Sequence, residues 1–140
     1  MPTILIIDTN IWAYFFDRDA AEHRRVEGPV ENALKTEQIA ANTIVVMELA
    51  QFLVRSLGPV SGGEKLGLFL RFPLAISDFE YQDALEAVDM LKRYSHLGIC
   101  GRDATILALM RRAKVNRIMT HDAALKRVDW LEVIDPLQAA

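Results

Sequence analysis

The sequence predicts an α/β fold: a three-layer α/β/α sandwich around a central, mostly parallel sheet of about five short strands. Continuous apolar runs such as Thr3 to Ile7 are typical of strands buried on both faces, and parallel sheets are usually buried in this way. Longer segments with helical periodicity separate these runs. Because strands that alternate with helices build a parallel sheet covered on both faces, the order of the segments favours this architecture.

Each element has its own local signal. The expected strands lie at residues 3–7, 38–40, 74–76, 117–120 and 132–134. The expected helices lie at residues 10–16, 20–35, 43–56, 64–71, 78–94 and 102–113, with a short helical turn at 123–127. The expected helix caps are Asp19, Asn42 or Thr43, and a capping box of Ser77 with Glu80. Gly28-Pro29 could interrupt the second helix, and the Gly- and Pro-rich stretch 58–63 predicts a loop.

Length and composition predict one globular domain that spans residues 1–140, since a chain of this length can bury its own core. An apolar fraction of 51% with 25% charged residues excludes a disordered chain. No apolar run approaches the roughly 20 residues of a membrane span, and the N-terminus lacks the basic region of a secretory signal. A cytoplasmic protein without membrane contact is therefore expected.

Four acids stand where the apolar pattern predicts burial. Asp8 and Asp122 each follow a predicted strand, at the sheet edge where α/β proteins bind ligands. Glu48 shares a helix face with apolar residues four positions to either side, and Asp103 shares a face with apolar residues in the first turns of its helix. Buried carboxylates repel one another unless a positive charge neutralises them. All four could reach one pocket, which predicts an acidic metal site.

Each acid also has a structural alternative. Asp8 and Asp122 could simply cap the helical turns that follow them, and Asp103 could serve the dipole at its helix start. Glu48 could form a buried ion pair with Arg55, two turns further along.

If the four acids form a metal site, their hard oxygen ligands suit Mg²⁺ or Mn²⁺, and such ions are commonly used to cleave phosphodiesters.

Charge and cysteine content exclude several classes of protein. A formal net charge of −3 argues against a protein that holds nucleic acid by a broad positive field, so a metal or local basic groups would have to do so. The single cysteine, Cys100, cannot form an internal disulfide and is expected to be a small buried hydrophobe. The spacing of His96, His121 and Cys100 does not match a zinc site, and His121 is expected to be exposed.

The ordered set of acids resembles the PIN-domain ribonucleases, especially the small VapC-type toxins of toxin–antitoxin pairs. Four segments carry the resemblance along essentially the whole chain: ILIIDTNIW, NTIVVMELAQF, GRDATILALM and NRIMTHDAAL. The resemblance implies that Asp8, Glu48, Asp103 and Asp122 are catalytic and bind one or two Mg²⁺ or Mn²⁺ ions. It gives Thr9, Asn10 and Thr120 supporting roles. Many relatives carry a further acid where this chain has Ala124, which weakens a second metal position.

The resemblance also implies a function: a metal-dependent endoribonuclease that hydrolyses RNA phosphodiester bonds as the toxin of a VapBC-type system. It implies single-stranded or loop RNA as substrate, a homodimer, and a small antitoxin protein as partner. A housekeeping RNA-processing nuclease and a non-catalytic RNA-binding or partner-binding module are the alternatives. Two other enzyme classes fit poorly, because Asn10 stands where a haloacid dehalogenase phosphatase needs an aspartate and the glycines of GICGRD lack dinucleotide-binding spacing.

Overall fold

In the computed structural model, which describes residues 3–138, five parallel strands form one sheet in the order β3-β2-β1-β4-β5. The strands are β1 (Ile4–Ile7), β2 (Gln38–Asn42), β3 (Leu74–Ser77), β4 (Arg117–Met119) and β5 (Glu132–Ile134). All five strands lie where the sequence predicts them, within two residues at each end. The hydrophobic run of β1 occupies the middle of the sheet, where Leu5, Ile6 and Ile7 are fully buried.

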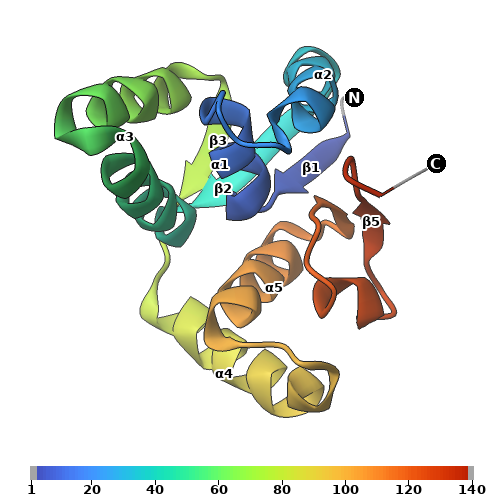
Figure 1. Cartoon of the computed structure of the whole chain (residues 1–140). Coiled ribbons are helices and arrows are strands. Elements are labelled where there is room, and N and C mark those ends of the chain that lie inside the picture. The colour runs from blue at the N-terminus through green and yellow to red at the C-terminus, as the bar shows by residue number, and fades with distance from the viewer. Residues whose placement is uncertain (1–2, 139–140) are drawn as a thin grey trace.

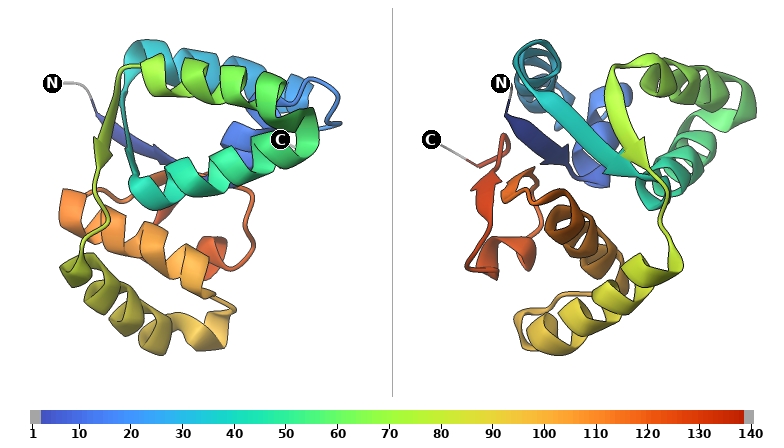
Figure 2. Two further views of the ribbon diagram at one scale, coloured as in Figure 1. Left: turned by 90° about the vertical axis from the view of Figure 1, so that its left-hand side faces the viewer. Right: turned by 180° about the vertical axis from the view of Figure 1, so that it is seen from behind.

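Helices cover both faces of this sheet and complete the predicted three layers (Figures 1 and 2). One face carries α1 (Thr9–Phe16), α2 (His23–Thr36) and α3 (Thr43–Arg71), and the other carries α4 (Tyr81–Tyr94) and α5 (Gly101–Ala113). Two short 3₁₀ turns, η1 (Ser95–Leu97) and η2 (Leu125–Arg127), complete the chain order. The right-handed connections between parallel strands place the helices in this way.

An aromatic cluster anchors α1 against the far half of α3. Trp12 and Phe69 are both fully buried, with ring centroids 5.0 Å apart and planes at 80°. Phe16 packs against both rings at 6.3 Å. Perpendicular aromatic contacts of this kind add to the free energy gained by burial. These residues therefore belong to the core rather than to a surface groove.

The loop predicted at residues 58–63 is wrong, because helix α3 continues through this stretch with a sharp kink at Gly58. Gly58 has a φ of 85°, which an L side chain adopts only with strain, and Pro59 restarts the helix at a position that needs no backbone donor. The two halves of α3 then pack closely against each other. A Cβ on Gly62 would lie 2.5 Å from the carbonyl oxygen of Leu53.

By length and composition alone, α3 is apolar enough to cross a membrane, which the run lengths in the sequence did not suggest. The kink at Gly58 divides it into two segments, each shorter than the roughly 20 residues that span a bilayer. Val45, Leu49 and Leu53 of the first segment pack into the core beneath the sheet. Other apolar side chains of α3, among them Met47 and Val60, are exposed.

Three local predictions about helix ends need correction. The capping box of α4 joins Glu80 with Asp83, not Ser77 with Glu80, because β3 extends through Ser77 and the helix begins later. Helix α2 begins at His23, so Asp19 does not cap it. Pro29 lies inside α2 without breaking it.

The strand order explains where a ligand can bind. After β1 the chain builds β2 and β3 on one side, then crosses to build β4 and β5 on the other. The backbone N–H of Asp8 donates to the carbonyl of Met119 at 2.9 Å, so the ends of β1 and β4 are held side by side. Ligands of open α/β sheets bind outside the carboxyl ends of strands at such a reversal.

Candidate functional site

Asp8 follows β1 directly and caps helix α1. Its Oδ1 accepts a hydrogen bond from the backbone N–H of Thr9 at 2.8 Å, and its Oδ2 accepts one from the hydroxyl of Thr120 at 2.7 Å. Only 4% of the residue is exposed. Burial raises the pKa of Asp8, while the Thr120 hydrogen bond and the charge of Arg102 oppose that rise. Capping uses only part of what a carboxylate can accept, so Asp8 can cap α1 and still serve a site.

Thr120 and Asp122 follow β4, beside the end of β1. The fully buried hydroxyl of Thr120 donates to Asp8 and accepts from the backbone N–H of Asp122 at 3.0 Å. Oδ1 of Asp122 accepts from the N–H groups of Ala124 and Leu125 at 2.8 and 3.2 Å, and so caps the turn η2. Thr120 therefore fixes the spacing between the two acids, while Asp122 also holds its own loop.

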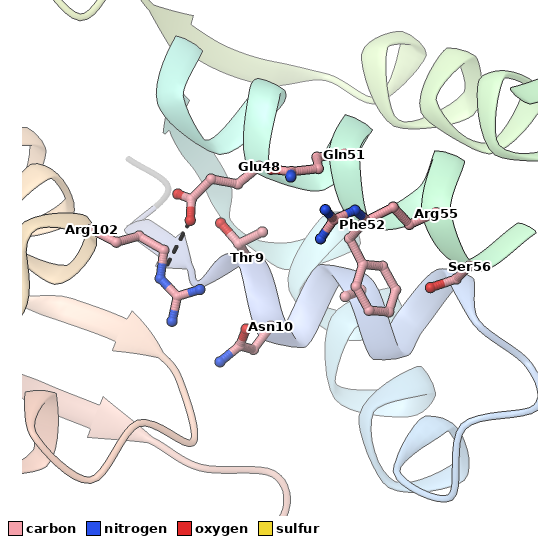
Figure 3. A pocket seen from close by; sticks show the side chains of 9 residues that line it. Thr9, Asn10, Glu48, Gln51, Phe52, Arg55, Ser56 and Arg102 are labelled. Atoms are coloured by element: carbon pink, nitrogen blue, oxygen red, sulfur yellow. Dashed lines mark ion pairs between the residues drawn. The ribbon is translucent and has the colours of Figure 1, made fainter. Parts of the chain in front are cut away.

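Glu48 lies in the second turn of α3 and reaches toward α5. Its Oε2 is 3.3 Å from Nε of Arg102, as Figure 3 shows, so the alternative ion pair with Arg55 is wrong. Its Oε1 is buried and has no hydrogen-bond partner within residues 3–138. Burial raises the pKa of Glu48 to about 7; the charge of Arg102 lowers it, and the charges of Asp8 and Asp103 raise it further.

Asp103 lies in the first turn of α5 and is 4% exposed. Its Oδ2 accepts hydrogen bonds from the backbone N–H and the thiol of Cys100, both at 3.3 Å. Burial raises the pKa of Asp103 to about 6, the hydrogen bonds from Cys100 oppose that rise, and the nearby charge of Asp122 adds to it. Cys100 is exposed, so its prediction as a buried hydrophobe is wrong: it sits at the helix start as a cap rather than in the core.

The four predicted acids thus share one electrostatic environment. Asp8 feels Asp122, Glu48 feels Asp8 and Asp103, and Asp103 feels Asp122. Within the described residues, however, no three Asp, Glu, His or Cys side chains lie close enough together to hold a metal ion. The donor set still fits one: the ligands are hard oxygens, and the buried Oε1 of Glu48 lacks a partner. Asp8, Glu48, Asp103 and Asp122 are therefore the residues that could hold a divalent ion.

A pocket of about 310 Å³ opens beside Glu48, between α1 and α3 (Figure 3). Its lining residues are Thr9, Asn10, Ala13, Glu48, Gln51, Phe52, Arg55, Ser56 and Arg102. The predicted supporting residues Thr9 and Asn10 thus lie on its α1 wall, whereas Asp8, Asp103 and Asp122 do not line it. Its size is that of a small ligand site. The groove leads away from the acids along one face of α3.

Sequence reasoning missed Arg102, which the structure places against Glu48 and beside the groove. The sequence does contain a signal for Arg102. This arginine directly precedes Asp103, a candidate metal ligand, and a cation is unexpected in a site built from carboxylates. The exposed side chain of His121 was predicted correctly, and it pairs with Asp135 at 2.8 Å.

The model of the PIN domain family matches residues 5–131 of the chain. No curated protein matches the sequence at a significant level.

Several solved structures have the same fold. VapC20 of Mycobacterium tuberculosis, described as a toxin that cleaves the sarcin–ricin loop, superimposes with a TM-score of 0.76 at 18% identity, covering 87% of this chain and 92% of its own. VapBC2 of Rickettsia felis, bound to a DNA fragment from its promoter, gives 0.75 at 22% identity, covering 95% and 98%. DNA-bound VapBC of Salmonella typhimurium gives 0.73 at 15% identity, covering 96% and 98%. At these identities the likeness concerns the fold.

Proposed function

Because the chain belongs to the PIN domain family, we propose that it is a divalent-metal-dependent endoribonuclease that acts as the toxin of a toxin–antitoxin pair. The observation that carries this proposal is that the charges of Asp8, Glu48, Asp103 and Asp122, which lie around the sheet's reversal point, act on one another. Such a group of carboxylates costs folding free energy that a purely structural role would not require. Binding of Mg²⁺ or Mn²⁺ would recover that cost.

The four acids would hold the ion, and a bound ion would supply an activated water and stabilise charge on the reacting phosphate. The remaining residues would set the geometry. Thr120 holds the Asp8 carboxylate by its 2.7 Å hydrogen bond and positions the Asp122 backbone at 3.0 Å. Asn10 and Thr9 face the groove, where the RNA backbone would enter. Residues of the strands and helices thus position the acids, and the pocket orients the substrate.

The structural neighbours support the substrate and partner. One is described as cleaving an RNA loop, and others are VapB–VapC assemblies, in which the toxin chain has a partner. We extend these two properties to this chain: an RNA loop or single strand as substrate and a small antitoxin as inhibitor. We further propose a homodimer, which the sequence resemblance implies, and a cytoplasmic location. An arginine from an antitoxin tail would pair well with the exposed edge of these carboxylates.

Cleavage of total cellular RNA by the purified, partner-free chain tests the proposal. Wild type with Mn²⁺ or Mg²⁺ should give discrete products, and chelator should abolish them. Asp8→Asn and Asp103→Asn should lower turnover by at least about a hundredfold, since each removes a charge from the proposed ligand set. Glu86→Gln, a change on the exposed part of α4, is the matched control and should cut normally.

Three outcomes separate the alternatives. Undiminished cleavage by Asp8→Asn and Asp103→Asn would refute the assigned site. Metal binding without cleavage of any RNA would instead favour a binding module. If the chain cuts RNA but induced expression does not slow growth in the absence of a partner, the nuclease has a housekeeping role rather than that of a toxin.

A further inference from the structure

Arg102 is the second residue of α5 and spans the gap to α3. Its Nε lies 3.3 Å from Oε2 of Glu48, and 45% of its side chain is exposed against 21% of the Glu48 side chain. In Figure 3 the two outer nitrogens of the guanidinium point away from Glu48, on the Asn10 side of the groove. The ion pair therefore joins two helices from opposite faces of the sheet at the mouth of the acid cluster.

The contact is loose for an arginine–carboxylate pair. Arginine commonly binds a carboxylate through two parallel hydrogen bonds, but here one nitrogen approaches one oxygen. The second oxygen of Glu48, Oε1, is buried and has no partner within the described part of the chain. The charge of Arg102 nevertheless acts on both Glu48 and Asp8. Arg102 thus supplies positive charge to the cluster but leaves the acceptor oxygen Oε1 of Glu48 without a hydrogen bond.

We propose that Arg102 is a displaceable counter-cation: it neutralises Glu48 while no metal is bound, yields that carboxylate to the divalent ion, and then offers its guanidinium to an RNA phosphate in the groove. This inference rests on the proposed function. Three observations carry it: the single loose contact to Glu48, the unpartnered Oε1, and the position of Arg102 on the wall of the 310 Å³ pocket. The exposed stem lets the side chain move without disturbing the core.

A divalent ion can displace Arg102 from Glu48 because the two interactions differ in strength. A partly exposed ion pair contributes little to stability, whereas a divalent ion with several carboxylate ligands binds far more strongly. In the absence of metal, Arg102 would prevent Glu48 from reaching its ligand position.

Calorimetric titration of the metal-free full chain with Mn²⁺ tests the first half. Arg102→Gln removes the competitor and its repulsion of the ion, so Mn²⁺ should bind about fivefold tighter than to wild type. Arg102→Lys keeps the charge and should bind Mn²⁺ within about twofold of wild type. The matched control is Arg111→Gln on the same helix, whose side chain is 47% exposed and pairs with Glu86 at 3.5 Å; its Mn²⁺ affinity should not change. The gain in Arg102→Gln should shrink as salt rises.

An oligoribonucleotide that spans the cleavage site mapped for the wild type tests the second half. With saturating Mn²⁺, Arg102→Gln should raise KM by up to about tenfold while kcat falls little. The reason is that the lost phosphate contact contributes to RNA binding and not to the chemical step. If the Arg102–Glu48 ion pair served only the structure, Arg102→Gln would either weaken the binding of both Mn²⁺ and RNA or leave both unchanged. It would not tighten Mn²⁺ binding while it weakens RNA binding.

The results separate this inference from the function it rests on. If wild type binds Mn²⁺ and Asp8→Asn weakens that binding, but Arg102→Gln binds Mn²⁺ no more tightly than wild type, the counter-cation role is overturned and the nuclease stands. Tighter Mn²⁺ binding with an unchanged KM overturns the transfer to RNA. If wild type binds no Mn²⁺, the proposed function itself fails. Circular dichroism melts of each variant verify that the fold is kept.

Discussion

Glu48 and Asp103 show how the burial of a carboxylate lowers the stability of a folded protein. The pKa of Glu48 is raised from 4.5 to about 7 and that of Asp103 from 3.8 to about 6, both chiefly by burial. The folded state therefore binds more protons than the unfolded chain between about pH 4 and pH 7. Stability contributed by these groups is greatest below that window, falls as pH rises through it, and stays low above pH 7. At neutral pH the metal-free site opposes folding.

Replacing Asp103 by Asn should stabilise the metal-free protein. The amide keeps an oxygen that can accept from the Cys100 N–H but carries no charge to bury. We expect the free energy of unfolding to rise by about 1–2 kcal/mol at pH 8, with most of that gain gone at pH 4.5. Urea denaturation with chelator at both pH values measures it, and Glu86→Gln, which removes an exposed charge, should show no such pH-dependent gain. An Asp103→Asn protein less stable than wild type at pH 8 would contradict the argument.

The residue scale also shows what a pattern can and cannot predict. The helical face of Glu48 was enough to predict that it turns inward, and its neighbours in the structure agree. Asp8 and Asp122 each cap a turn, as the structural alternative predicts, and the charge of one acts on the other; their role as metal ligands stays a prediction. Arg102 could not be assigned to Glu48, because the choice between Arg55 and Arg102 depends on how α5 packs across from α3.

Among the helices and strands, α3 is the one for which the local sequence led to a wrong prediction. Residues 58–63 are rich in Gly and Pro and so have the composition of a loop. Only Gly58, however, departs from helical geometry within α3. The remaining glycines stay helical because the two halves of α3 pack against each other, a tertiary contact that composition does not encode. The aromatic cluster around Trp12 then holds the second half in place.

Adjacent glycines of α3 make a matched pair that tests this packing. A Cβ at Gly62 would meet the Leu53 carbonyl at 2.5 Å and the Val54 Cα at 2.9 Å, whereas a Cβ at Gly63 would meet nothing within 4 Å. Gly62→Ala should therefore destabilise the protein by about 2–3 kcal/mol, and Gly63→Ala should stabilise it by up to about 1 kcal/mol, as alanine does within a helix. Thermal melts compare the two. Equal effects would show that the halves of α3 do not touch in solution.

At the scale of the whole molecule, the two edges of the sheet have different tasks. The four acids lie near the carboxyl ends of the strands, and their burial there lowers the free energy of unfolding at neutral pH. At the amino ends of the strands, the guanidinium of Arg117 pairs with Glu37 and, at 3.5 Å, with Glu132, and so joins the first residues of β4 and β5 to the residue before β2. Alternating strands and helices were enough to predict a parallel sheet, but not its order. That order depends on which side of β1 each crossover takes, a choice made by packing of whole helices.

Arg117 should therefore matter for stability and not for the site. Arg117→Met keeps the apolar stem but leaves Glu37, whose side chain is only 14% exposed, without its ion-pair partner and with only the hydrogen bond from the Thr3 hydroxyl. The unpaired carboxylate should cost about 2–3 kcal/mol in the free energy of unfolding. The Mn²⁺ affinity should stay within about twofold of wild type, because β4 still delivers Thr120 and Asp122 beside Asp8. Asp103→Asn should do the opposite, with a more stable metal-free protein and weaker Mn²⁺ binding. Urea denaturation and Mn²⁺ calorimetry on both variants measure the contrast, and a loss of metal affinity in Arg117→Met would show that the two edges are coupled.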